Sequence, residues 1–508
     1  MENSRIKNSI RNSSVSLITQ ILTVLINFIV KTVFIKMLSN EYLGINGLFS
    51  NIITMLSLAD LGIGMAIPYS LYEPLAKNDK KRIKILMKFY SKIYNIIGIV
   101  VLLIGLSLIP FLEFLIKDIP DISHLGFIYS LFVLHSASSY FFIYKKFLVD
   151  SDQLSYITSR IVFIFSTILS VVQIIILLLF KNYILFLFAS VVFVVLQNLV
   201  ISSKVNKMYP YIKDKEEGNL NKEDVKDITK NVSSLFIYKV GTVITNGTDN
   251  IVISKFIGLI AVGFYSNYLL IINSLNNIVN QIFNSITSSI GNLVVTTNSK
   301  RSYRIYENLN FFSFWLYGLC SICIMVMINP FISLWIGSEY TLGIEVVFLL
   351  ASNLYTMGMQ NVTNSFRNSY GLFYIARFRP VIMVIINIVV SILLVQFIGI
   401  AGVIIGTIFS RLVTTTWLDP YIVHNHGFKI SPKKYYLKYS LYLLVFILTN
   451  WIVYFVTSKI IISNIFMWIL VGIISVALVN IIFLLIFFKT SEFKYFYNKI
   501  ISKFRQFK

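Results

Sequence analysis

Residues 15–38 read VSLITQILTVLINFIVKTVFIKML, an apolar run that carries a few polar side chains. Gln20, Thr23, Asn27 and Lys31 are spaced by three, four and four residues, which places them on one face of a helix. A helix of this length spans about 36 Å, which is enough to cross the hydrocarbon core of a bilayer. The run therefore predicts a transmembrane helix with one polar face.

Thirteen further runs of this kind follow, which predicts an all-α polytopic membrane protein. Hydrophobic residues make up 56% of the 508 residues, and charged residues make up only 13%. The predicted spans are 15–38, 43–70, 92–116, 125–148, 157–180, 183–203, 232–257, 259–296, 309–333, 343–366, 380–398, 400–422, 437–457 and 461–488. The run at 259–296 is longer than one crossing needs, so we expect it to extend or bend beyond the membrane.

Lys and Arg fall almost entirely on one side of these spans. With the N-terminus inside, the inner loops and termini carry 36 of the 44 cations, the outer loops carry five, and three lie within spans. Because cations accumulate in cytoplasmic loops, this bias predicts a cell-membrane protein with both termini in the cytoplasm. Topology and attraction to anionic membrane lipid account for the net charge of +22, so nucleic acid is not an expected partner.

The chain also contains an internal repeat at an offset of 219 residues. Asn27 aligns with Asn246, Lys36 with Lys255, and Gly44 with Gly263. Six spans per copy is an even number, so the two copies are expected to be parallel six-helix bundles. The predicted organisation is a first bundle at 1–203, a cytoplasmic linker at 204–231, a second bundle at 232–422, two further helices at 437–488 and a basic cytoplasmic tail at 489–508.

Charged residues within the spans are candidates for function, because inserting one costs about 2.5–3.5 kcal/mol on translocon scales. The sequence places Lys31, Asp60, Lys239, Asp249 and Arg411 in such positions. Two interpretations stay open for each of them. They line a hydrated path for a substrate or ion, or they form structural salt bridges, for instance between Lys239 and Asp249.

Amide side chains form a second set of candidates. Asn27 and Asn246 hold corresponding positions in the two copies, and Asn273, Asn277 and Asn280 follow one face of the run at 259–296. In lipid, such groups need a polar partner or water. They are therefore expected either to join helices or to line a hydrated cavity.

The sequence carries no motif for catalysis or cofactor binding. It has no phosphate-binding glycine loop, nucleophile elbow or metalloprotease helix, and the predicted outer loops are short. Cys320 and Cys323 lie in an apolar run, where packing is their expected role. We expect a transporter without cofactor or metal rather than an enzyme, and the short outer loops disfavour a membrane glycan polymerase.

Residues 41–94 read EYLGINGLFSNIITMLSLADLGIGMAIPYSLYEPLAKNDKKRIKILMKFYSKIY. This stretch resembles the Wzx-type polysaccharide-biosynthesis flippases of the multidrug/oligosaccharidyl-lipid/polysaccharide exporter superfamily. The resemblance implies two six-helix lobes in a V around a cationic cavity, with two C-terminal helices packed outside. It also implies translocation of an undecaprenyl-diphosphate-linked oligosaccharide for capsule, exopolysaccharide or a related glycan, beside polymerase and assembly proteins of the same pathway.

The candidate residues suit this substrate chemically. Lys31, Lys239 and Arg411 suit the diphosphate, and the asparagine stripes suit sugar hydroxyls. Because no ATP-binding motif is present, a proton or sodium gradient, or consumption of the product, has to supply the energy. Asp60 and Asp249 are then the candidates for ion coupling.

Two related functions remain as alternatives. An ion-coupled multidrug or cation antiporter of the same superfamily has the same fold, but its cavity is expected to be dominated by acids and aromatic rings. The charges within the spans here are balanced, with Asp419 joining Asp60 and Asp249 on the acidic side. A flippase for peptidoglycan precursors or teichoic-acid units is closer still, and these residues do not distinguish it.

Overall fold

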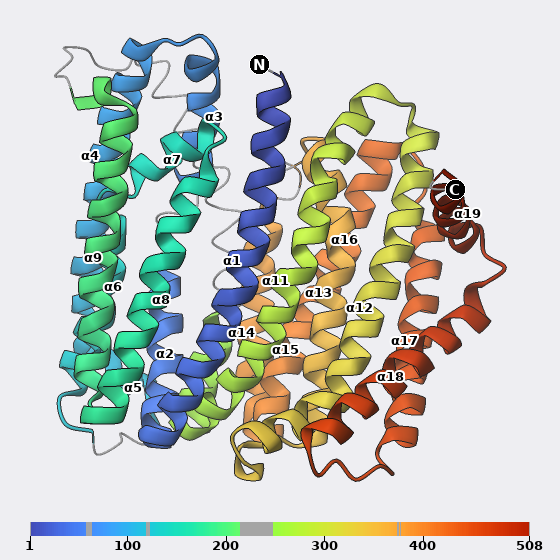
Figure 1. Cartoon of the computed structure of the whole chain (residues 1–508). Helices are drawn as coiled ribbons and strands as arrows, with labels where there is room; N and C mark the ends of the chain where they lie inside the picture. Colours follow the sequence, from blue (N-terminus) through green and yellow to red (C-terminus); the bar gives the residue numbers. More distant parts are fainter. Residues whose placement is uncertain are drawn as a thin grey trace. The chain divides into compact units, whose positions relative to one another are not determined.

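A computed structural model describes residues 2–56, 63–117, 122–213, 247–372, 375 and 377–506. The chain divides into two compact units, Met1–Gly263 and Phe264–Lys508. All regular structure in the described residues is helical, which confirms the predicted all-α membrane class. Figure 1 shows long helices that run side by side within each unit.

The first unit is built on helices that pack lengthwise. α1 packs along α8, α4 packs on α6, and α9 packs on both α6 and α8. Tyr90 and Tyr94 are fully buried in the core of this unit. The elements are α1 (Glu2–Met37), α2 (Asn40–Leu56), α3 (Ile63–Ala76), α4 (Lys80–Ser107), η2 (Ile109–Phe111), α5 (Leu112–Leu115), α6 (Leu125–Tyr140), α7 (Tyr144–Ser151), α8 (Ser155–Phe180), α9 (Tyr183–Met208) and η3 (Pro210–Lys213), and residues 247–256 are also helical.

The second unit is centred on α12, which packs on α13, α17 and α18. The ring of Phe314 stacks on Tyr442 at 4.5 Å and contacts Phe483 at 4.8 Å between centroids. The elements are α11 (Leu259–Thr296), which begins just before the unit boundary, α12 (Ser299–Trp335), η4 (Ser338–Tyr340), α13 (Ile344–Ser369), α14 (Arg379–Ile398), α15 (Ile400–Val413), α16 (Thr415–Ile422), the π-helical segment η5 (Val423–Phe428), α17 (Lys433–Thr457), α18 (Ile465–Phe487) and α19 (Ser491–Gln506).

Most of the predicted spans are helices in the structure. Among the described residues, ten helices are long and apolar enough to cross a membrane, and eleven if α6 and α7 form one bent span. Three predicted spans are not in this set. The span at 43–70 includes residues outside those described, the span at 232–257 lies mostly outside them, and 343–366 corresponds to α13, which is long enough but carries many polar side chains.

The boundary between the predicted bundles is not covered by the structure. The predicted linker at 204–231 is described only up to residue 213, and the division into compact units falls later, within α11. The helix at 247–256 belongs to the first unit by this division. The limits of the two predicted bundles therefore stay predictions.

Asparagine and aspartate side chains cap helices where the predicted loops end. Asp79 accepts a hydrogen bond from the backbone N–H of Arg82, which opens α4. Asn182, Asn298 and Asn464 accept the equivalent bond at the start of α9, α12 and α18. Because the first N–H groups of a helix have no partner within it, these caps fix where each helix begins.

The predicted span at 125–148 is broken, contrary to the continuous helix expected. α6 and α7 meet at an angle of 44°, and Phe142 at the break has a φ of +68°. The side-chain amide of Asn198 on α9 donates to the carbonyl oxygens of Ser139 and Phe141, both at 3.1 Å. A break at membrane depth is tolerated when a neighbour satisfies the freed carbonyls, and Asn198 supplies that partner.

Two glycines that the internal repeat aligns lie against each other. A Cβ on Gly44 would be 2.0 Å from the carbonyl oxygen of Leu259, and one on Gly263 would be 3.1 Å from the backbone nitrogen of Gly44. α2 and the start of α11 can therefore approach this closely only because both positions lack a side chain.

Candidate functional site

The polar face of α1 is partly open in the first unit. Asn27 is exposed and Lys31 is half-buried. The Lys31 ammonium lies 5.5 Å from the centroid of the Phe34 ring, at cation–π distance. Phe34 in turn contacts the ring of Tyr183 at 5.5 Å. The structure therefore places Lys31 beside an aromatic cluster and leaves the neighbouring Asn27 accessible.

Three of the candidate residues lie outside the described part of the chain. These residues are Asp60, Lys239 and Asn246. The pairing of Lys239 with Asp249, and the ion-coupling role of Asp60, stay predictions.

Asp249 is described, and it is buried. It is 6% exposed on the helix at 247–256, between the buried side chains of Thr248 and Asn250. The Oδ1 atom of Asn250 has no hydrogen-bond partner among the described residues. This segment therefore holds a carboxylate, which can take up a proton, and a spare amide oxygen inside the first unit, and both groups can coordinate hard cations.

The asparagine stripe of α11 divides into an open part and a bonded part. Asn273 and Asn277 are exposed. Asn280 accepts hydrogen bonds from the hydroxyl of Tyr317 at 2.9 Å and from the amide of Asn361 at 2.8 Å. Asn280 therefore joins α11 to α12 and α13, whereas Asn273 and Asn277, on the same helix, remain available to another molecule.

Arg411 is also engaged within its own unit. It is 6% exposed on α15, and its guanidinium donates to the side-chain oxygen of Asn353 at 2.9 Å and to the Asn353 carbonyl at 3.2 Å. Its contacts therefore tie α15 to α13.

A buried cluster of charges was not predicted as a unit. Arg367 at the end of α13 donates to both carboxylate oxygens of Asp419 at 2.9 Å, and Arg379 at the start of α14 pairs with the same carboxylate. All three side chains are at most 4% exposed. Both arginines lie at the ends of the predicted loop 367–379, and the fold buries them against Asp419 on α16.

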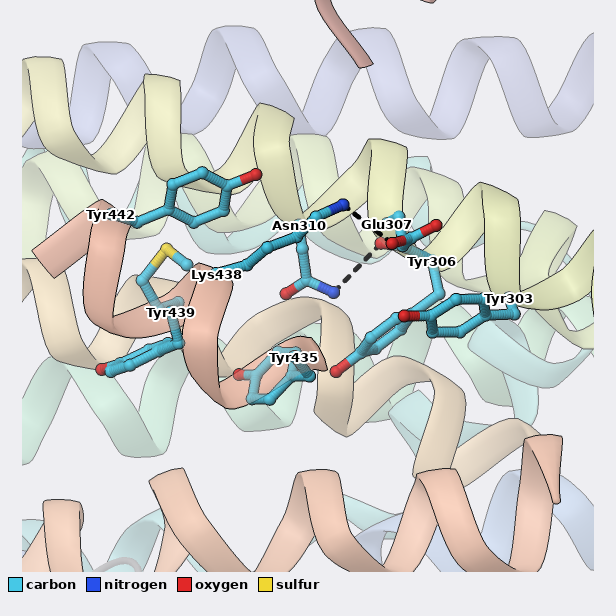
Figure 2. Close-up of a pocket in the computed structure, with 9 residues that line it drawn as sticks. Tyr303, Tyr306, Glu307, Asn310, Tyr435, Lys438, Tyr439 and Tyr442 are labelled. Carbon is cyan, nitrogen blue, oxygen red and sulfur yellow. Dashed lines mark hydrogen bonds and ion pairs between the residues drawn. The ribbon is translucent and has the colours of Figure 1, made fainter. Parts of the chain in front are cut away.

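A small pocket lies inside the second unit, between α12, α13 and α17, and its volume of about 20 Å³ is enough for a water molecule (Figure 2). Its lining residues are Tyr303, Tyr306, Glu307, Asn310, Met359, Tyr435, Lys438, Tyr439 and Tyr442. Asn310 is 4% exposed and donates to the Tyr306 carbonyl at 3.0 Å, while its Oδ1 atom has no hydrogen-bond partner among the described residues. The pocket therefore offers tyrosine rings and a spare amide oxygen to a small polar guest.

One rim of this pocket is an ionic network. The Lys438 ammonium donates to Glu307 at 2.8 Å and also pairs with Glu492 of α19, while Lys434 lies 3.2 Å from Glu307. Burial acts to raise the pKa of Glu492, but the hydrogen bond from Lys438, a bond from its own backbone N–H and the Lys438 charge outweigh it and leave the pKa lowered. This network joins α12, α17 and α19.

Comparisons with known proteins were made at the level of sequence and of structure. No protein-family model matches the chain, and no curated protein sequence matches it. An inward-facing multidrug resistance MATE family transporter of the MOP superfamily is similar in structure, with a TM-score of 0.60 and 15% identity, over 79% of this chain and 97% of that one. A mutant of the Vibrio cholerae MATE transporter VcmN gives a TM-score of 0.58 and 15% identity over 82% of this chain and 96% of its own.

A second class of protein is similar over more of the chain. The lipid II flippase MurJ, in an inward closed conformation, gives a TM-score of 0.62 and 14% identity over 92% of this chain and 98% of its own. At these identities the likeness establishes the fold. The chain therefore has the fold shared by MATE transporters and MurJ, that of polytopic membrane transporters and flippases.

Proposed function

We propose that this protein is a flippase that moves an undecaprenyl-diphosphate-linked oligosaccharide across the cytoplasmic membrane for assembly of a surface polysaccharide. The observation that carries the proposal is the extent of the fold match. The two MATE structures match almost over their whole length, but about a fifth of this chain has no counterpart in them. MurJ matches over 98% of its own length and 92% of this chain. The greater length shared with MurJ favours a lipid-linked substrate over a small soluble drug.

Each unit has an open polar face of its own that suits part of the substrate. On the first unit, Asn27 binds hydroxyl groups of the glycan and Lys31 binds the diphosphate. On the second unit, Asn273 and Asn277 bind hydroxyl groups of the glycan. Asn246, which the repeat aligns with Asn27, is assigned to the glycan. Lys239, a cation within a predicted span, is assigned to the diphosphate, and Asp60 and Asp249 are assigned the coupling to a proton or sodium gradient. Asn280 and Arg411 are assigned a supporting role, because their side chains are hydrogen-bonded to neighbouring helices.

The orientation follows from the cation bias. We place both termini in the cytoplasm, so the pocket, whose residues Tyr303 to Asn310 lie near the start of α12, is assigned to the cytoplasmic end of the second unit. The substrate would then be loaded from the face on which lipid-linked oligosaccharides are synthesised.

Depletion of the protein in its own host tests the proposal. Export of the surface polysaccharide should stop, and lipid-linked repeat units should accumulate on the inner leaflet, where they are protected from a glycosidase added to intact cells. Accumulation of lipid II instead would assign this protein the role of a lipid II flippase such as MurJ. Unchanged lipid-linked pools with increased sensitivity to organic cations would instead support the antiporter.

A further inference from the structure

The C-terminal helix α19 begins three residues after the last membrane span ends. α18 ends at Phe487 and α19 begins at Ser491. Phe487 contacts the rings of Phe311 and Phe314 on α12, at 5.5 and 5.3 Å. α19 is therefore tied to the place where α18 leaves the membrane.

α19 packs on the part of α12 that Phe487 also contacts, and does not project away from this helix. Phe493 stacks on Trp315 at 5.9 Å, and Phe496 contacts Phe312 at 5.8 Å. Glu492, which is 6% exposed, pairs with Lys438 of α17. These contacts hold the helix at the depth of the last turn of α18, which is the surface of the bilayer.

The side of α19 that does not pack on α12 is basic and aromatic. Lys489 and Lys494 are exposed, as are Tyr495, Tyr497 and Lys499. From residue 488 to the C-terminus the sequence has six cations and a single acid, Glu492, whose carboxylate is turned inward. Tyrosine and lysine together are typical of helices that lie among headgroups.

We propose that Lys494 and Lys499 of α19, together with Lys489 just before this helix, bind the headgroups of anionic phospholipids. Each cation near an anionic surface strengthens association about fivefold. Glu492 and the two phenylalanines fix the opposite face to α12 and α17, so the lipid contact stabilises the docked position of the helix. This interaction is independent of the transported substrate.

Hydrogen exchange of the full chain in nanodiscs tests this proposal. Peptides that cover 489–500 should exchange at least about threefold more slowly in discs containing phosphatidylglycerol than in discs of phosphatidylcholine alone. The double variant Lys494→Gln/Lys499→Gln should lose that difference. The matched variant Lys181→Gln/Lys459→Gln, which removes the same charge from two other exposed loops, should retain it.

Equal exchange of the unmodified protein in both kinds of disc overturns the proposal, and this comparison requires no variant to fold. The proposal is also overturned if soluble polyglutamate slows hydrogen exchange of these peptides and phosphatidylglycerol does not. The basic surface would then bind an acidic protein rather than lipid. A difference that survives in the Lys494→Gln/Lys499→Gln variant would show that these lysines do not bind the lipid.

Discussion

Lys31 and Arg411 are both cations within predicted spans, but their surroundings differ. Lys31 is half-buried beside the Phe34 ring, next to the exposed Asn27. Arg411 is buried and donates to the backbone and side chain of Asn353. The first environment suits recognition of a diphosphate, and the second suits attachment of α15 to α13.

Alanine substitutions should separate the two residues. Lys31→Ala should reduce polysaccharide export at least about tenfold with normal protein abundance, because a charge-assisted contact to the substrate is lost. Arg411→Ala should lower the amount of folded protein, because Asn353 loses its partner. Quantitative blots of membranes, measured beside export, check both.

The conservative variant supplies the control. Lys31→Arg keeps the charge but changes its geometry, so we expect partial export. Normal export from Lys31→Ala would remove Lys31 from the proposed site.

Asp419 is the single carboxylate that pairs with both Arg367 and Arg379. Asp419→Asn would remove the negative charge that both buried guanidinium groups contact, and breaking a buried pair of this kind costs about 3–5 kcal/mol. We therefore expect a large fall in the thermal midpoint of the purified protein. Glu73→Gln, which removes one partner of the exposed Lys77–Glu73 pair, should leave the midpoint unchanged.

At the scale of the elements, apolar run length was enough to predict most helices. It could not predict the break between α6 and α7, because Asn198, which satisfies the freed carbonyls, lies about 57 residues farther along the chain. The periodicity places Asn277 and Asn280 on the same face of one helix. It therefore could not predict that Asn277 is exposed whereas Asn280 is hydrogen-bonded to other helices. The difference arises from Tyr317 and Asn361, on two other helices.

The burial of charged residues was also not predictable from local sequence. Arg367 and Arg379 flank a short connection and have the local pattern of solvated loop cations. Their burial depends on Asp419, 52 and 40 residues away. Local sequence holds no signal for that contact, whereas the preference of a buried charge for a partner becomes evident once the helices are packed.

Docking of α19 should depend on pH through Glu492. Its pKa is lowered in the folded protein, so the pairing with Lys438 stabilises the fold fully above the unfolded value of about 4.3 and is lost as the pH falls through the folded value. The thermal midpoint of the unmodified protein should exceed that of Glu492→Gln near neutral pH. The difference should close below the ordinary glutamate range, and a constant difference would show that the ion pair is not its cause.

At the scale of the whole molecule, the cation bias and the repeat predict the same membrane topology. An even number of spans in each copy puts 204–231 and both termini on the same side. The structure describes helices on both sides of this segment, but no membrane is part of it. The topology is therefore tested best on cells.

Single cysteines in a background with Cys320 and Cys323 replaced by serine test this claim. A membrane-impermeant maleimide added to intact cells should label Lys181→Cys, between α8 and α9, because that loop is predicted to be outside. Leu220→Cys should react only after the membrane is permeabilised, since its segment is rich in charge and predicted to be inside. Polysaccharide export by each variant confirms that the labelled protein is native. Labelling of Leu220→Cys from outside intact cells would reverse the orientation, and with it the face from which the substrate is loaded.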